Sequence, residues 1–553
     1  MEQLKLYNSR LDAHNTQNCG FSIIEIMIAM AIGVMVISAA ILVSFGNQSM
    51  VLSSTTNAEA VAKAQELIQW QEALARQDFN LVNPTSSTET MGGLTYTKTV
   101  SVTRSPQYLT KQVAAVVSWA GDHGQALSTT FTTFVSNLEN VHAPTTCNSE
   151  LSGDWAHPSR MDYDFGELVN NGHAVDGFLL SDIEVHAKKL YAIAYDTPAA
   201  FKSTFFIFDL ENPLAPTLAA RIDTSPTTGA PALQAITVAS TSIEKVAFLA
   251  NAYHANFKTC KPGPACSQLQ VYDVQSATLG SATASTSVRL GTSTAPYVWA
   301  NGGGGQAVGK SVFYKDGYLY LGLSTTGNGP GFHVIDVRTP LSPVWLGSWP
   351  APSIAFGTSG APINGIQVKG RYAYLSHPNG LVGGANEQLT ILDVSDPANP
   401  VRVGGFSKPT GIGGNGKVTA QLGPLLYFGR TASNISGAAD ATNELYVLDV
   451  AHLASTPATF LGGTSLATAD SINSLMVREH LAFVLTNKQF QVWDVSNPTS
   501  IRPWTHSGVM TEFLALPGGS GVAMDCEDNY FYVASHAPLG QEKDVLSVMH
   551  AGI

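Results

Sequence analysis

The chain has 553 residues, of which 44% are hydrophobic and only 13% are charged, and its formal net charge is −12. The length predicts two or three domains, and a composition this apolar excludes a largely disordered chain. The acidic balance argues against nucleic acids and other polyanions as partners, because proteins that bind them are usually basic.

The first element is an apolar run without charges, from Ile26 to Phe45. Its twenty residues would form a helix of about 30 Å, long enough to cross the core of a bilayer, so we expect a membrane segment at about 26–45. A secretory signal has a shorter apolar region, and a plain membrane anchor leaves Glu25, just before the run, unexplained. No Lys or Arg follows the run until Lys63, which predicts that the C-terminal side lies outside the cytoplasm.

A motif around Glu25 accounts for it. Gly20-Phe21-Ser22-Ile23-Ile24-Glu25 closely resembles the signal of type IV prepilins and pseudopilins. The resemblance implies that residues 1–20 are a leader, that a prepilin peptidase cuts after Gly20, and that Phe21 becomes the N-methylated first residue. A leader of twenty residues is long for this class, and the true start methionine stays open.

Glu25 is the residue that we expect to direct assembly. A lone carboxylate near hydrocarbon is energetically costly, so a subunit waiting in the membrane carries an unsatisfied group. The free α-amino group of Phe21 on a neighbouring subunit would neutralise this carboxylate and fix the axial register between helices. The expected partners of the N-terminal helix are therefore the inner membrane before assembly and other pilin subunits afterwards.

The following segment predicts a small α+β domain within residues 21–140. Apolar residues recur at helical spacing from Ser54 to Phe79. Leu94–Arg104 alternates as a strand, and Gln112–Ala120 and Leu127–Val135 flank a Gly-Asp-His-Gly turn as a hairpin. A long helix with a small antiparallel sheet is the plan of a pilin, and the last of these strands resemble the end of minor pilins.

Residues 141–160 lack periodicity and are expected to be a linker. Residues 161–553 then repeat one unit of turn, strand, loop, strand ending in Asp, turn and strand. The aspartates of the unit are Asp209, Asp273, Asp336, Asp393, Asp449 and Asp494. A period of roughly 40–60 residues built from short strands predicts an all-β propeller, and the copies resemble the LVIVD-repeat family of propellers. Six copies and a truncated last one predict seven blades, with the missing outer strand supplied by Met161–Leu168.

The five cysteines are Cys19, Cys147, Cys260, Cys266 and Cys526. Processing removes the first, and the even number that is left permits two disulfides in an exported chain. Cys260 and Cys266 bracket a short Lys-Pro-Gly-Pro-Ala turn, so we expect them to pair, which leaves Cys147 to pair with Cys526. The alternative for either pair is that it is reduced.

No motif indicates a catalytic residue, a metal site or a cofactor. The sequence has no H-E-x-x-H, no G-x-S-x-G and no Asp-rich calcium loop. One carboxylate per blade is too dispersed for a metal, so the repeated Asp is expected to accept backbone N–H bonds where its strand enters a turn. Residues 304–311 match the phosphate-binding G-x-x-x-x-G-K-S loop, but a strand pattern follows instead of the helix that such a loop requires, so we expect a blade loop.

The sequence thus predicts a type IV pilin-like filament subunit that is not an enzyme. A propeller of this length would be roughly 50–55 Å across, which is difficult to repeat along a tightly wound shaft, so we expect a minor subunit at the pilus tip. There it would display the propeller for adhesion or for binding an unknown surface ligand. The expected localisation is the inner membrane, as a single-pass protein, and then the extracellular pilus or pseudopilus.

Two alternatives stay open. One is a type II secretion pseudopilin that engages cargo. The other is a surface-tethered propeller enzyme, which clustered polar side chains in the central funnel would favour.

Overall fold

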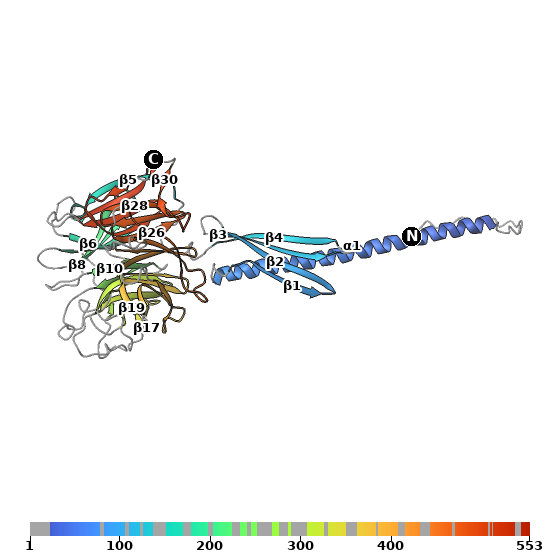
Figure 1. The fold of residues 1–553 in the computed structure, drawn as a ribbon, viewed down its shortest axis with the longest axis horizontal. Helices are drawn as coiled ribbons and strands as arrows, with labels where there is room; N and C mark the ends of the chain where they lie inside the picture. Colours follow the sequence, from blue (N-terminus) through green and yellow to red (C-terminus); the bar gives the residue numbers. More distant parts are fainter. Residues whose placement is uncertain are drawn as a thin grey trace, which may run out of the picture. The chain divides into compact units, whose positions relative to one another are not determined.

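The computed structural model describes residues 23–77, 82–104, 110–121, 125–136, 147, 151–169, 178–196, 203–223, 233–240, 245–251, 268–275, 286–288, 307–325, 330–349, 362–382, 385–406, 415–431, 443–466, 470–506, 509–510, 513–536 and 544–552. These residues form two compact units, each of which is described by itself. The first holds most of a long helix and of one sheet, and the second holds the remaining sheets (Figure 1).

The helix α1 (Ile23–Gln77) spans 55 residues. It contains no proline, and strong helix formers (Ala, Leu, Glu and Gln) are frequent in its second half. The apolar run and the amphipathic segment that follows it are therefore parts of one continuous element.

The expected membrane segment is not supported by the structure. Within the described part of the chain, no helix combines the length and the apolar character that crossing a membrane requires. This finding corrects the segment predicted at about 26–45 and, with it, the localisation predicted for a single-pass protein of the inner membrane.

The first sheet has four strands. In order across the sheet they are β1 (Thr85–Met91), β2 (Leu94–Arg104), β3 (Thr110–Ala120) and β4 (Ala126–Ser136). β2 has the predicted bounds, and β3 and β4 are neighbours, as the predicted hairpin requires. β1 was not predicted because it is a mostly exposed edge strand rich in Ser and Thr, without an apolar face to reveal it.

Small side chains let this sheet approach α1 closely. Ala60 and Ala64 are fully buried against Tyr96, Val117 and Trp119. Alanine has a short side chain, so the large aromatic groups of the sheet can pack directly on the helix backbone.

Seven sheets of the second unit share one pattern, in which each strand pairs with the next one. Six of them are built from consecutive strands: β6 (Phe178–His186), β7 (Lys189–Asp196), β8 (Ser203–Asp209) and β9 (Thr217–Asp223); β10 (Leu233–Ser240), β11 (Lys245–Asn251), β12 (Leu269–Asp273) and β13 (Thr286–Val288); β14 (Ala307–Lys315), β15 (Tyr318–Thr325), β16 (Phe332–Asp336) and β17 (Val344–Trp349); β18 (Gly365–Lys369), β19 (Tyr372–Val382), β20 (Ala385–Asp393) and β21 (Val401–Phe406); β22 (Gly416–Leu422), β23 (Leu425–Arg430), β24 (Leu445–Asp449) and β25 (Thr459–Thr464); β26 (Ile472–Arg478), β27 (Leu481–Thr486), β28 (Gln489–Asp494) and β29 (Arg502–Pro503), with β32 (Leu514–Ala515) also paired to β28. A separate small hairpin is formed by β30 (Thr505–His506) and β31 (Val509–Met510).

The seventh sheet combines the two ends of this unit. Its order is β33 (Ser520–Glu527), β34 (Tyr530–His536), β35 (Val545–Gly552) and β5 (Asp154–Asp164), so a strand from before the first repeat completes the last one. A strand from this region was predicted, but it begins at Asp154, inside the expected linker, and the residues after it form the short helix α3 (Phe165–Val169). Pairing with β5 covers the edge of β35 that would otherwise be open.

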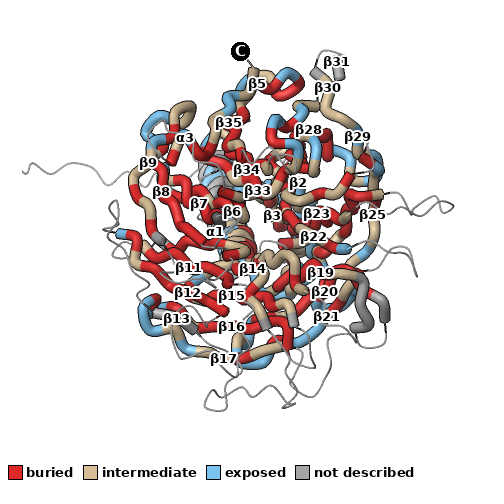
Figure 2. The backbone as a smooth tube through the Cα atoms, turned by 90° about the vertical axis from the view of Figure 1, so that its left-hand side faces the viewer, coloured by how far each residue is buried: buried red, intermediate tan, exposed pale blue. Residues whose placement is uncertain are grey.

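The first strands of the seven sheets lie next to one another in a closed cycle. Their order is β6, β10, β14, β18, β22, β26 and β33, and β33 contacts β6 again. Figure 2 shows first strands such as β6, β14, β22 and β33 in the middle and last strands such as β9, β17 and β25 at the rim. This is a propeller-like, mostly β architecture.

Local sequence explains the strands and the tight turns between them. The third strands are buried along almost their whole length, as in Phe332–Asp336 and Leu445–Asp449, because neighbouring sheets cover both of their faces. The turns from first to second strands need a residue with positive φ, which Gly370 (57°) and Gly423 (56°) supply and Asp528 (50°) also adopts.

Candidate functional site

The residues expected to act in processing and assembly lie at the start of the chain. Gly20 and Phe21 are outside the described residues, and Glu25 lies in the first turns of α1, with its side chain also outside them. Large apolar side chains that follow on the same helix are exposed by 53–71%: Met27, Met30, Ile32, Val34, Met35, Val36 and Ile37. Because four of them are consecutive, the apolar surface extends around the helix, and a helix that is hydrophobic all round is normally covered by other apolar surfaces.

The repeated aspartates have a structural role. In each of six sheets, Oδ1 of the aspartate that ends the third strand accepts a hydrogen bond of 2.9–3.2 Å from the backbone N–H two residues later. Four of the aspartates also pair with a basic side chain: Asp209 with Lys189, Asp336 with Arg338, Asp393 with Arg371 and Asp494 with Arg502. Hydrogen bonding to Arg338 lowers the pKa of Asp336, which keeps the acceptor ionised. The predicted bonding of this aspartate at the turn is confirmed.

Asp449 offers a clean test of this bond, because its Oδ1 accepts from Ala451 N at 2.9 Å. Asp449→Ala is expected to lower the free energy of unfolding by about 1 kcal/mol, since it leaves the turn N–H without its acceptor. Asp449→Asn keeps an acceptor oxygen and should retain most of the stability. Urea unfolding of the two variants checks this, and equal stabilities would contradict the role of the bond.

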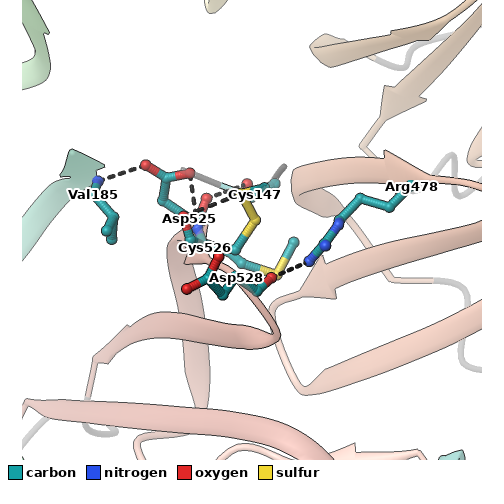
Figure 3. Close-up of a disulfide and its surroundings, with 8 residues drawn as sticks. Cys147, Val185, Arg478, Asp525, Cys526 and Asp528 are labelled. Carbon is teal, nitrogen blue, oxygen red and sulfur yellow. Dashed lines mark hydrogen bonds between the residues drawn. A yellow bond between two sulfur atoms is a disulfide. The ribbon is translucent and has the colours of Figure 1, made fainter. Parts of the chain in front are cut away.

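A disulfide joins Cys147 and Cys526, whose Cα atoms are 5.4 Å apart (Figure 3). Cys526 lies on β33, and Cys147 precedes β5 in the sequence, so the bond links a strand of the last sheet to the chain that leads into β5 of the same sheet. The two sulfurs lie near Asp525, but bonded sulfurs are not thiolates and do not act as metal ligands. Cys260 and Cys266 are outside the described residues, and their pairing stays a prediction.

Carboxylates on the first strands tie neighbouring sheets together. Asp182 Oδ2 on β6 accepts a hydrogen bond of 3.0 Å from Ile236 N on β10, and Glu184 Oε1 accepts one of 2.9 Å from Val238 N. One sheet earlier, Asp525 Oδ2 on β33 accepts a hydrogen bond of 2.5 Å from Val185 N on β6 (Figure 3). The innermost strands of three successive sheets are thus connected by acid-to-backbone bonds.

These acids titrate far from their ordinary range. Burial raises the pKa of Asp182 and of Asp525 to about 7. Burial, together with the charge of Asp525, raises the pKa of Glu184 well above its ordinary value. Clustered polar side chains at the centre were the feature expected of an enzyme, yet these three are engaged by backbone N–H groups and fix the positions of strands.

The match to a phosphate-binding loop has a different structural cause. Residues 307–315 form strand β14, so the expected blade loop is wrong for residues 307–311. Ser311 Oγ donates a hydrogen bond of 2.8 Å to Ile363 O, just before β18 of the next sheet. A Cβ on Gly309 would collide with Gln268 O and Asn251 N of the preceding sheet. The glycine therefore permits close packing of strands, and no helix N-terminus follows to hold a phosphate.

Two histidines are buried in the third and second strands of adjacent sheets. His333 Nδ1 accepts a hydrogen bond from Trp345 Nε1 at 3.3 Å, and His377 Nε2 lies 2.9 Å from Thr390 Oγ1. Burial lowers the pKa of His333 to about 3 and that of His377 to about 4, so both rings are neutral at physiological pH.

Comparison with known families gives two partial matches. Residues 15–41 match the prokaryotic N-terminal methylation motif, and residues 363–407 match the LVIVD repeat. The two predicted resemblances are therefore confirmed for these segments, and neither match is to a family of enzymes. No curated protein matches the chain.

Solved structures with similar folds are distant in sequence. The WD40 domain of Neurospora crassa Pan2 is 11% identical, with 73% of this chain and 98% of that chain covered and a TM-score of 0.42. The periplasmic gluconolactonase PpgL of Pseudomonas aeruginosa is 12% identical, with coverages of 61% and 88% and a TM-score of 0.39. Kluyveromyces lactis Hsv2 is 9% identical, with coverages of 68% and 99% and a TM-score of 0.35. The prepilin-type signal implies processing by a prepilin peptidase and assembly with pilin subunits.

Proposed function

We propose that this chain is a minor subunit of a type IV pilus-like filament, located at the tip, where it displays a seven-bladed propeller for adhesion or partner binding. The main support for the proposal is that the exposed apolar surface of α1 lies within the segment that matches the prokaryotic N-terminal methylation motif. Apolar helices of other subunits are the surface that would cover it, in the core of a filament.

Glu25 would set the register of that packing. A carboxylate placed among apolar helices costs free energy unless an opposite charge pairs with it. The α-amino group of Phe21 on an adjacent subunit is the charge that processing after Gly20 would create. The pairing would therefore couple assembly to cleavage.

The seven-blade count is supported by the closed cycle of first strands and by the six repeated aspartates. A propeller of this length is roughly 50–55 Å across, which makes one copy at every position of a tightly wound shaft difficult to accommodate. A position at the tip avoids this crowding and leaves the propeller accessible to a partner.

Immunogold labelling of a C-terminal epitope on the full-length protein tests this location. We expect label at the ends of filaments, and no filament label for a Gly20→Arg variant that the peptidase cannot cleave. Label distributed along the shaft would contradict the tip position. Label on short secretion-dependent filaments would favour the pseudopilin alternative instead.

A further inference from the structure

Six of the seven first strands have a β-bulge near their start. Pairing with the second strand shifts register once in each of these six, and the extra residues are Ser181, Gln234, Lys310, Lys417, Asn473 and Val522. All six are half-buried. A bulge turns one side chain away from the ordinary alternation of the strand.

The residues that follow the bulge on β14 contact its neighbouring sheets. On β14, Ser311 bonds to the following sheet at Ile363, whereas Val312 packs in the cluster of the preceding sheet with Phe248. The bulged Lys310 takes part in neither packing. It donates instead to Gln234 Oε1, the bulged residue of the adjacent first strand, at 3.0 Å. The bulged side chains of these two adjacent first strands therefore contact each other.

Two of these positions hold lysines, Lys310 on β14 and Lys417 on β22, with one sheet between them. Burial and repulsion by Lys417 lower the pKa of Lys310, and burial lowers that of Lys417. Asp182 attracts Lys310, but its two carboxylate oxygens accept from Ile183 N and Ile236 N. Within the described chain, the ammonium of Lys417 has no hydrogen-bond or ion-pair partner. Two like charges thus lie near each other without a dedicated counter-charge.

We propose that the bulged lysines Lys310 and Lys417 form a binding site for one small oxyanion, a carboxylate or phosphate group, on the inner side of the cycle of first strands. Gln234 accepts a hydrogen bond from Lys310 through Oε1, and its amide nitrogen would add a neutral donor to the site. An oxyanion between the ammonium groups replaces their mutual repulsion with two charge-assisted hydrogen bonds. Half-buried lysines lose less to solvent screening than exposed ones, so the attraction is stronger than on the surface. The inference holds whether or not the chain assembles into filaments.

Calorimetric titration of the full-length protein with sodium phosphate and, separately, with sodium acetate tests the site at constant ionic strength. We expect saturable binding of one anion per chain. Lys310→Gln and Lys417→Gln should each weaken it at least about tenfold, because each removes one charge-assisted bond. Tighter phosphate binding would identify a phosphate-bearing ligand, and tighter acetate binding a carboxylate-bearing one.

Thermal unfolding is a second measurement, which tests the proposal even if a variant is less well folded. Without added anion, either variant should raise the midpoint of thermal unfolding, because it removes the repulsion between the lysines. Lys188→Gln is the matched control, since its side chain is 61% exposed on a turn, and it should bind like the wild type. The proposal is overturned if the wild type shows no saturable binding, or if both variants at 310 and 417 bind with wild-type affinity.

Discussion

Glu25→Leu is expected to leave cleavage after Gly20 intact and to reduce incorporation into filaments at least about tenfold. Leucine fits the apolar surface of α1 but removes the partner of the α-amino group on the adjacent subunit. Losing one paired charge among apolar helices costs more than about 1.4 kcal/mol, which corresponds to a tenfold change in an equilibrium. Immunoblotting of sheared filaments, with the mass of the mature N-terminus measured in parallel, gives both readings.

Glu66→Leu is the matched control for this variant. Glu66 is exposed on the same helix, so its substitution changes charge and hydropathy equally without affecting the proposed pairing. It should be incorporated like the wild type. Normal incorporation of Glu25→Leu would refute the pairing of Glu25 with the amino terminus.

The stability of the propeller is expected to depend on the acids that connect its first strands. The pKa of Asp182 and of Asp525 is about 7 in the folded protein, against an ordinary value of 3.8. At pH values from about 4 to about 7, these two carboxyl groups bind more protons in the folded state than in the unfolded state. The stabilising contribution is therefore complete below the ordinary pKa and is lost as pH rises through about 7.

The buried histidines act in the opposite direction. The pKa of His333 is lowered to about 3 and that of His377 to about 4, so the folded state binds fewer protons than the unfolded state up to about pH 6.5. Their contribution is present above the unfolded pKa and is lost as pH falls. The pH profile of the wild type alone thus mixes two opposing slopes.

Comparison with the double variant Asp182→Asn/Asp525→Asn separates the contribution of the two acids from that of the histidines. The variant loses some hydrogen bonds at every pH, but only the wild type has the two titrating acids. The difference in unfolding free energy, wild type minus variant, should be larger at pH 5 than at pH 8 by a few kcal/mol. Asp316→Asn, at an aspartate 82% exposed on a turn, is the control. Parallel profiles of wild type and double variant from guanidinium unfolding would show that these acids do not titrate as described.

Features encoded within a few residues were predictable. The alternation of Leu94–Arg104 gives β2 with its observed bounds, because side chains of a strand point to opposite faces in turn. The repeated aspartates mark the ends of third strands, because an Asp carboxylate reaches the N–H two residues on. The prepilin-type signal is likewise a local motif of residues 15–41.

Features that depend on distant partners were not predictable. The apolar spacing indicated a helix and included Ala64, which the sheet does bury, but it did not indicate Ala60, which is also fully buried against the sheet. Nothing in the Ser-Asp-Ile-Glu pattern at 181–184 shows that both acids bond to β10, although acids within an apolar strand are a signal that could have raised the question.

The sequence by itself determined the strand-and-turn unit and its repeated aspartate, since both follow from spacing along the chain. The tertiary structure decided where β5 begins, which residues bulge and which acids and lysines meet at the centre. Closure of the cycle sets these, because the register of each first strand must fit the sheet on either side of it, and that constraint is not present in any one repeat.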